Sequence, residues 1–293
     1  MTPPCLAIKN LSANLANGAR VLRDVSLAVA PGEVRALVGE SGAGKSMIGK
    51  AVLGVLPPSV RVVGGDMHLE GADLGAMSGK ARRTLIGART ALIPQDPLTA
   101  LNPSRRIGPQ MTDRLVHILG WDQAKAAARV RELLDEVQIR APDRVMRLYP
   151  HELSGGMRQR ALIAAAFAAE PRLIVADEPT TALDVTVQKQ ILRLIAEMQR
   201  ERGTAVLFIT HDLGVVAKIS QTVTVLYAGK VVEDTTARQL FSAPQHVYSR
   251  ALLAATPRYT DPEASLLPVD EAVMAALAEE IATADSEWRA QHG

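Results

Sequence analysis

The stretch that decides the fold reads VRALVGESGAGKSM at residues 34–47. Residues 34–38 are mostly apolar, as expected for a strand in a buried parallel sheet, and they run straight into a glycine-rich turn at residues 39–46. A helix is expected to follow as far as Leu56, because Pro57 and Pro58 cannot continue it. A buried strand, a glycine-rich turn and a helix, in that order, predict a loop that binds phosphate groups.

The turn has the spacing of such a loop, a glycine followed by four residues and then Gly-Lys-Ser. Its glycines let successive backbone N–H groups point inward at a phosphate, and the dipole of the following helix adds positive potential. Lys45 is expected to reach the β- and γ-phosphates and the Ser46 hydroxyl to coordinate magnesium. An accidental glycine-rich turn is the alternative, and the flanking strand and helix disfavour it. The predicted nucleotide-binding residues of this loop are Gly39, Glu40, Ser41, Gly42, Ala43, Gly44, Lys45, Ser46 and Met47.

Two acids, Asp177 and Glu178, end a second apolar strand expected at residues 172–176. Asp177 is expected to hold the magnesium ion through its water shell. Glu178 follows it and is expected to polarise an attacking water as a general base. An acidic strand end that merely caps the next loop is the alternative, and the presence of a phosphate loop favours the site.

Two more polar residues stand where strands are expected to end. His211 follows the predicted strand at residues 205–210, and Gln95 ends the one that includes residues 91–95. Ligands of α/β proteins bind at the carboxyl edge of the parallel strands. A lone histidine is more often structural, but this location predicts a functional role for His211. Gln95 is expected to touch both the metal and the nucleophilic water.

Ser154, Gly155 and Gly156 open a helix that is expected to continue to Ala169. Serine at this position is an ordinary helix cap. The free N–H groups and the helix dipole would equally suit an anion. The spacing alone leaves both interpretations open.

The remaining sequence predicts the layers around these residues. Residues 6–12 and 25–29 alternate like strands on either side of an Asn17-Gly18 turn. Helical periodicity replaces this pattern from about residue 97 to 157, and strands then alternate with helices. The predicted fold is α/β, with a mostly parallel sheet covered by helices on both faces, an antiparallel β subdomain and an inserted helical subdomain. Residues 70–90 are interpreted as a linker rich in glycine and arginine. A last helix is expected to gather on one face Val273, Leu277, Ile281, Ala284 and Trp288.

Composition excludes several classes of protein. The net charge of the 293 residues is only +2 and no long run of one sign occurs, which argues against nucleic acid as a partner. Cys5 is the single cysteine, so a disulfide within the chain is impossible. The longest apolar stretch, residues 161–169, is far shorter than the roughly 20 residues of a membrane-spanning helix. A cytoplasmic location is expected, with any membrane association arising through a partner.

Taken in order across residues 6–257, these features resemble the ATP-binding subunits of ABC transporters. Residues 39–46 are similar to that family's Walker A motif, Gln95 to its Q-loop, residues 153–160 to its signature and His211 to its switch histidine. Asp177 and Glu178 resemble Walker B, and residues 182–184 the D-loop, which adds Asp184 to the cofactor-binding set. The resemblance implies ATP and Mg²⁺ as cofactors, and the P-loop ATPase core that the family shares. It also implies a head-to-tail dimer, in which residues 154–156 contact ATP held by the other chain.

Residues 95–103, 149–153, 177–188 and 246–253 further resemble the oligopeptide, dipeptide and nickel importers of that family. That branch implies a second ATPase chain, identical or related, together with two transmembrane permeases and an extracytoplasmic solute-binding protein. The expected location is then the cytoplasmic face of the inner membrane. The expected function is ATP hydrolysis that powers import of peptides or similar small solutes. Residues 6–257 would form the ATP-binding domain, with its helical subdomain near 97–157, and residues 258–293 a tail with an amphipathic helix.

The chain departs from the family at two places. The aromatic residue on which adenine normally stacks is matched here by Leu15, so apolar packing is expected to replace stacking. The tail has no cysteine, so no iron–sulfur cluster is predicted there. Two rival functions remain, an ATP-binding accessory subunit of a soluble enzyme complex such as carbon–phosphorus lyase, and a translation or DNA-repair ATPase. The second rival usually has two ATPase domains in one chain or long inserts.

Overall fold

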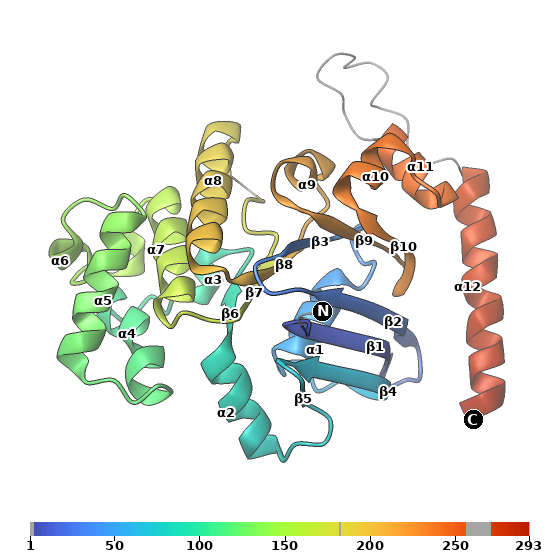
Figure 1. Cartoon of the computed structure of the whole chain (residues 1–293), viewed down its shortest axis with the longest axis horizontal. Coiled ribbons are helices and arrows are strands. Elements are labelled where there is room, and N and C mark those ends of the chain that lie inside the picture. The colour runs from blue at the N-terminus through green and yellow to red at the C-terminus, as the bar shows by residue number, and fades with distance from the viewer. Residues whose placement is uncertain (1–2, 182, 256–270, 293) are drawn as a thin grey trace.

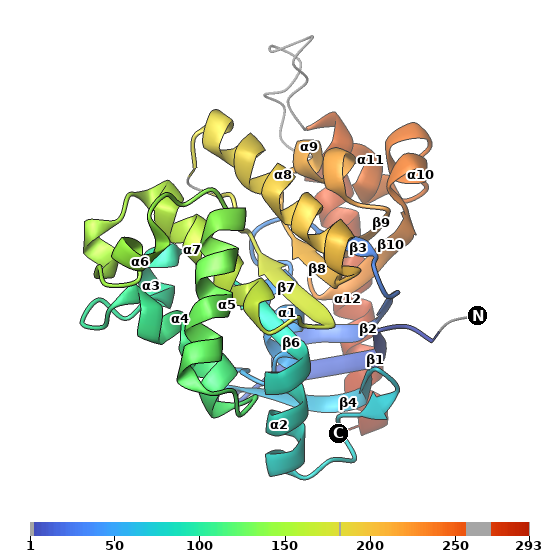
Figure 2. The same ribbon diagram turned by 60° about the vertical axis from the view of Figure 1, so that its left-hand side comes forward.

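A mixed sheet runs through the computed structural model, which describes residues 3–181, 183–255 and 271–292 (Figures 1 and 2). Its strands are β1 (Leu6–Leu15), β2 (Arg20–Val29), β3 (Val34–Val38), β4 (Val60–Leu69), β5 (Ala72–Asp73), β6 (Thr90–Ile93), β7 (Leu173–Asp177), β8 (Ala205–Ile209), β9 (Thr222–Tyr227) and β10 (Lys230–Thr236). Their order across the sheet is β5-β4-β1-β2-β10-β9-β3-β8-β7-β6. Within the described residues, no helix is long and apolar enough to cross a membrane.

The parallel half of the sheet comprises β9, β3, β8, β7 and β6. Alternate residues of β8 belong to different hydrophobic cores. Phe208 packs with helical residues on one face of the sheet, and Leu207 packs in the core on the opposite face. Helix α1 (Lys45–Val52) packs on the face that contains Leu207, and α8 (Val185–Arg202) packs in the core that contains Phe208. Helix α9 (Leu213–Ile219) packs in a separate core with residues of β3 and β9. Burial on both faces is why these strands are almost continuously apolar. The predicted parallel sheet with helices on both faces is confirmed.

The antiparallel strands form the second layer. β1 pairs with β2 across the predicted turn, in which the Asn17 side chain accepts a hydrogen bond from the Ala19 N–H at 3.1 Å. β4 pairs with the other edge of β1. Leu11 and Leu22 are fully buried and share a core with Ile48 of α1. This layer therefore packs directly behind the helix that begins at Lys45.

The helical residues gather at one end of the molecule (Figure 1). Leu115, Val130 and Phe167 are fully buried in their common core. The elements there are α3 (Pro97–Ala100), α4 (Ile107–His117), α5 (Gln123–Glu136), α6 (Pro142–Val145), the short 3₁₀ turn η1 (Pro150–Glu152) and α7 (Gly155–Ala168). Helix α7 extends past residue 157, the predicted end of the helical subdomain, and packs on both α5 and α8. The helical subdomain is therefore joined to the α/β core through one continuous helix.

The interpretation of residues 70–90 as a linker is wrong, because they contain a helix, α2 (Gly79–Arg89). Ser78 caps this helix by accepting a hydrogen bond from the Ala81 N–H at 3.3 Å. Ile86 is its one buried residue. A helix that buries so little has no apolar stripe, so its sequence lacks the periodic signal of a packed helix.

Three helices follow the sheet, α10 (Ala237–Ser242), α11 (Val247–Ala254) and α12 (Glu271–His292). α12 runs along the edge of the molecule beside β2 (Figure 1). Its inward face is the predicted one, because Leu277 is 4% exposed and Trp288 lies 4.6 Å from the Arg20 guanidinium. The predicted domain boundary at residues 257 and 258 lies outside the described residues.

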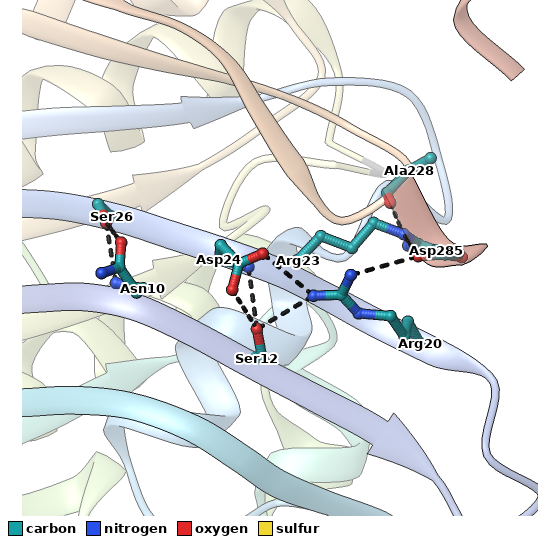
Figure 3. A network of polar contacts seen from close by, with 8 residues as sticks. All are labelled: Asn10, Ser12, Arg20, Arg23, Asp24, Ser26, Ala228 and Asp285. Atoms are coloured by element: carbon teal, nitrogen blue, oxygen red, sulfur yellow. Dashed lines mark hydrogen bonds and ion pairs between the residues drawn. The ribbon is translucent and has the colours of Figure 1, made fainter. Parts of the chain in front are cut away.

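Asp285 anchors α12 to β2 (Figure 3). Its carboxylate accepts hydrogen bonds from Arg23 Nε at 2.8 Å, Arg23 Nη2 at 2.6 Å and Arg20 Nη1 at 3.4 Å. Arg20 also donates to Ser12 and Asp24. Burial opposes the charge of Asp285, yet the two arginines hold its pKa below the ordinary value. The contact between Asp285 and the two arginines is therefore a charged one that joins α12 to β2.

Asp285→Ala is expected to lower the free energy of unfolding by about 3 kcal/mol, because it leaves the largely buried Arg23 guanidinium without a carboxylate and Arg20 with Asp24 alone. Urea unfolding of the full chain measures this. Glu287→Ala is the matched control, since Glu287 is an exposed acid on the same helix and its loss should cost under about 0.5 kcal/mol. Equal effects of the two variants would contradict the anchoring role.

Candidate functional site

The predicted functional residues of the parallel strands meet at one edge of the sheet. The loop at residues 39–44 follows β3, Asp177 ends β7, and His211 and Gln95 lie just beyond β8 and β6. β7 and β8 are in register with Asp177 opposite Ile209. Parallel strands bring their carboxyl ends together, so polar residues far apart in the sequence surround one site.

The glycine-rich loop has the shape that its spacing predicts. Gly42 and Gly44 have φ angles of 84° and 99°, in the region that favours glycine. A Cβ atom at Gly39, whose φ angle is 151°, would lie 2.1 Å from the Leu226 carbonyl oxygen. Within the described residues, the N–H groups of Gly42 and Gly44 have no hydrogen-bond acceptor. These donors fit an oxyanion such as a phosphate.

Lys45 lies inside this loop and is 5% exposed. Its ammonium donates to the carbonyl oxygens of Gly39 and Glu40, each at 2.7 Å. Burial lowers the pKa of Lys45, and the neighbouring Glu178 and Asp177 carboxylates oppose that shift. The buried cation is thus held by the same loop that carries the Gly42 and Gly44 amides.

Ser46 and Asp177 form the part of the site that suits a metal ion. The Ser46 hydroxyl donates to Asp177 Oδ1 at 2.9 Å. Burial raises the pKa of Asp177, as does the adjacent Glu178, while the hydrogen bond from Ser46 lowers it. A hydroxyl and a carboxylate oxygen side by side are the hard donors that Mg²⁺ prefers, so these residues fit the ion that the sequence predicts.

Glu178 lies at the centre of a small polar network. Its carboxylate accepts hydrogen bonds from Gln95 Nε2 at 3.2 Å and Thr181 Oγ1 at 3.0 Å, and it lies 3.0 Å from His211 Nδ1. The backbone at Glu178 is left-handed, with φ 46°, an arrangement often found where a side chain is held for function. Thr181 was not predicted from the sequence. Its contact depends on this local backbone and has no signal of its own.

The structure does not bring residues 154–156 to the loop within one chain. Ser154 caps α7 by accepting a hydrogen bond from the Met157 N–H at 3.3 Å. No hydrogen bond among the described residues joins this segment to residues 39–47. Ser154 and Gly155 are exposed, and a Cβ atom at Gly155 would meet nothing within 4 Å. The helix start therefore has open space in front of it.

Asp184 likewise acts as a helix cap within its own chain. Its carboxylate accepts hydrogen bonds from the N–H groups of Thr186 at 3.0 Å and Val187 at 2.9 Å, at the start of α8. It is exposed. Ala182 of the predicted D-loop lies outside the described residues.

Leu15, the predicted counterpart of an adenine-stacking residue, ends β1 and is 37% exposed. Its N–H donates to the Ala19 carbonyl at 2.8 Å across the hairpin turn. The second strand of that hairpin passes the phosphate loop, since a Cβ atom at Gly44 would lie 3.3 Å from the Val21 carbonyl. Leu15 is therefore on the hairpin that flanks the loop.

Comparisons with known proteins match this chain to ATP-binding proteins of ABC transporters. Residues 22–181 match the ABC transporter family. A probable peptide ABC transporter ATP-binding protein of Sinorhizobium fredii is 46% identical, over 89% of this chain and 78% of its own length. A probable D,D-dipeptide transport ATP-binding protein of Escherichia coli is 47% identical, over 92% of this chain and 83% of its own length.

Solved structures share the fold. A subunit of an ABC transporter complex from Clostridium perfringens superposes with a TM-score of 0.72 at 24% identity, covering 85% of this chain and 95% of its own. A dimeric ATP-binding cassette with bound ADP and phosphate gives a TM-score of 0.70 at 23% identity, covering 80% of this chain and 99% of its own. At this level of identity the likeness concerns the fold alone, and it agrees with the α/β architecture predicted from the sequence.

Proposed function

This chain belongs to the ATP-binding proteins of ABC transporters and is an ATPase, and from that premise we propose that it powers the import of peptides or similar small solutes. One structural observation carries the proposal. The phosphate loop, the Ser46–Asp177 pair and the Glu178 network lie together at the carboxyl edge of the sheet. The peptide substrate class rests on the names of relatives at 46% and 47% identity.

The proposed ATP site uses residues 39–47. The amides of Gly42 and Gly44 would donate to the phosphates, and Lys45 would exchange its carbonyl partners for phosphate oxygens. Ser46 and Asp177 would hold Mg²⁺, with Gln95 as a further contact. Mg²⁺ supplies neutralisation of the phosphate charge.

Hydrolysis is assigned to Glu178. A water molecule attacks the γ-phosphorus in line with the bond to ADP, and the Glu178 carboxylate accepts the proton of that water. ADP and inorganic phosphate are the products. His211 and Gln95 contact this carboxylate, as does Thr181, so they fix the direction in which it accepts the proton.

Dimerisation is proposed to complete the site. The exposed helix start at residues 154–156 would donate to ATP held by a second ATPase chain, and Asp184 would lie near that interface. The second chain would be a copy of this one or a relative. Two permeases and an extracytoplasmic binding protein would complete the transporter at the cytoplasmic face of the membrane. Residues 6–257 would act as the ATP-binding domain, with residues 258–293 as its tail.

An accessory role in a soluble enzyme complex such as carbon–phosphorus lyase is the rival function. Purifying the tagged chain from solubilised membranes distinguishes the two. Co-purified permeases, together with uptake of a labelled peptide that stops when the gene is deleted, would support import. Co-purified lyase subunits without permeases would exclude it.

Glu178→Gln is expected to keep ATP binding and to slow hydrolysis by about 10²–10⁴-fold, because it removes the proton acceptor and leaves the loop intact. Phosphate release by the assembled transporter measures the rate, and titration with ATP measures the affinity. Glu132→Gln, an exposed acid on α5, is the control and should hydrolyse ATP normally. A Glu178→Gln protein with near wild-type activity would contradict the assignment.

Leu15→Tyr is expected to tighten ATP binding by about 1 kcal/mol, because a tyrosine ring can stack on adenine where leucine cannot. With Leu15 in place, affinity rests mainly on the phosphates and magnesium, so GTP should bind about as well as ATP. Titration of both nucleotides tests this. A strong preference of the natural chain for ATP, with no gain in the variant, would count against it.

Gly156→Asp is expected to leave ATP binding by the isolated chain unchanged and to abolish ATP-dependent association with the second chain. The new carboxylate would face the γ-phosphate of the partner's ATP, and like charges repel. Gly156→Asn is the matched control, because it has nearly the same shape without the charge. A Cβ atom here meets Val187 only at 3.8 Å, so neither variant is excluded by crowding. Undiminished association of the Asp variant would show that residues 154–156 do not act on the other chain's nucleotide.

A further inference from the structure

Tyr248 connects a helix beyond the sheet to the phosphate loop. It belongs to α11, is fully buried and is among the largest side chains with no exposed surface. Its hydroxyl oxygen accepts a hydrogen bond from the Glu40 N–H at 3.2 Å, across 208 positions in the sequence. Glu40 is the second residue of the loop, so this contact reaches the loop where it leaves β3.

The start of α11 is itself held in place. Glu233 of β10 accepts hydrogen bonds from the N–H groups of Gln245 and His246, each at 3.0 Å. His246 then caps the helix, as its Nδ1 accepts a hydrogen bond from the Tyr248 N–H at 3.1 Å. Tyr248 therefore projects from a backbone that is fixed to the sheet, and its hydroxyl has a defined position.

The ring of Tyr248 packs on a neighbour that supports the other end of the loop. Tyr227, the last residue of β9, has its ring centroid 4.9 Å from that of Tyr248. The turn that follows, Ala228-Gly229, places the Gly229 N–H 2.8 Å from the Ala43 carbonyl oxygen, to which it donates. The loop is thus hydrogen-bonded at Glu40 to Tyr248 and at Ala43 to Gly229, and Gly42 lies between these two positions.

A backbone N–H that is partly shielded from water favours a protein acceptor, and for Glu40 the structure supplies a phenol oxygen. Burial raises the pKa of Tyr248 to about 12, so the hydroxyl stays neutral at physiological pH. Without it the Glu40 N–H would have to find water, and the first turn of the loop would be less ordered. The free amides of Gly42 and Gly44 depend on that turn for their direction. If the turn were less ordered, the Gly42 and Gly44 amides would have to be ordered when an anion binds, and the entropy lost in that step would weaken binding.

We propose that Tyr248 is a positioning residue of the phosphate loop, and that its hydroxyl holds the loop in the shape that binds the phosphates of the nucleotide. The proposal deepens the site described above and rests on the proposed function for the identity of the ligand. Tyr248 does not touch the ligand in this scheme. It acts through the backbone of Glu40.

The decisive comparison is Tyr248→Phe against Tyr227→Phe in the full chain. Each variant loses one hydroxyl from the same pair of contacting rings, and the Tyr248 variant alone loses the contact with Glu40. Tyr248→Phe is expected to weaken the binding of ATP and of inorganic pyrophosphate by the same factor, about fivefold, as the loss of one hydrogen bond predicts. Tyr227→Phe should change either affinity less than twofold. Both thermal midpoints should stay within about 3 °C of that of the natural chain.

Hydrogen exchange of the ligand-free protein gives a readout independent of nucleotide. Amides of residues 38–44 should exchange faster in Tyr248→Phe than in Tyr227→Phe, because the first turn has lost its acceptor. Unchanged exchange there would overturn the proposal, as would unchanged affinities or equal losses in both variants. If exchange rises but the natural chain binds neither ATP nor pyrophosphate, the positioning contact stands and the proposed function fails.

Discussion

A buried ammonium is the constraint on which the rest of this structure depends. Lys45 is 5% exposed, and a charge so placed must be compensated by nearby polar groups. The loop provides two carbonyl oxygens at 2.7 Å, and the carboxylates of Asp177 and Glu178 oppose the effect of burial on its pKa. The site can therefore keep its shape only if the ends of β3 and β7, which lie on either side of β8, hold their positions in the sheet. Burial of both faces of the parallel strands keeps them there.

The same arrangement separates two carboxylates that are adjacent in the sequence. Asp177 is still within β7 and turns toward Ser46, whereas the left-handed backbone at Glu178 turns the next side chain toward Gln95 and His211. One acid is thereby suited to holding a cation and the other to accepting a proton. The backbone thus turns between two adjacent acids, so that their side chains meet different partners.

Much of the fold and site could be predicted from sequence, because the informative signals are local. A strand, glycine-rich turn and helix in succession specify the loop, and parallel topology then places Gln95 and His211 at the same edge. Contacts that depend on the tertiary structure could not be predicted. Thr181 meets Glu178 only because of the backbone at residue 178. α2 buries a single side chain and so had no periodic pattern to recognise. Arg20 and Arg23 meet Asp285 more than 260 positions away, and nothing in the sequence pairs them.

Helix α12 and the phosphate loop are both linked to the turn at Ala228-Gly229. Arg23, which binds Asp285 of α12, also donates its side chain to the Ala228 carbonyl and its N–H to the Gly229 carbonyl at 2.8 Å. Gly229 in turn donates to Ala43 of the loop. A Cβ atom at Gly229 would lie 2.1 Å from the Val21 carbonyl oxygen, so this close approach of the turn to β2 requires glycine. Arg23 therefore contacts both α12 and the turn that donates to Ala43, which links α12 to the phosphate loop through Arg23 and this turn.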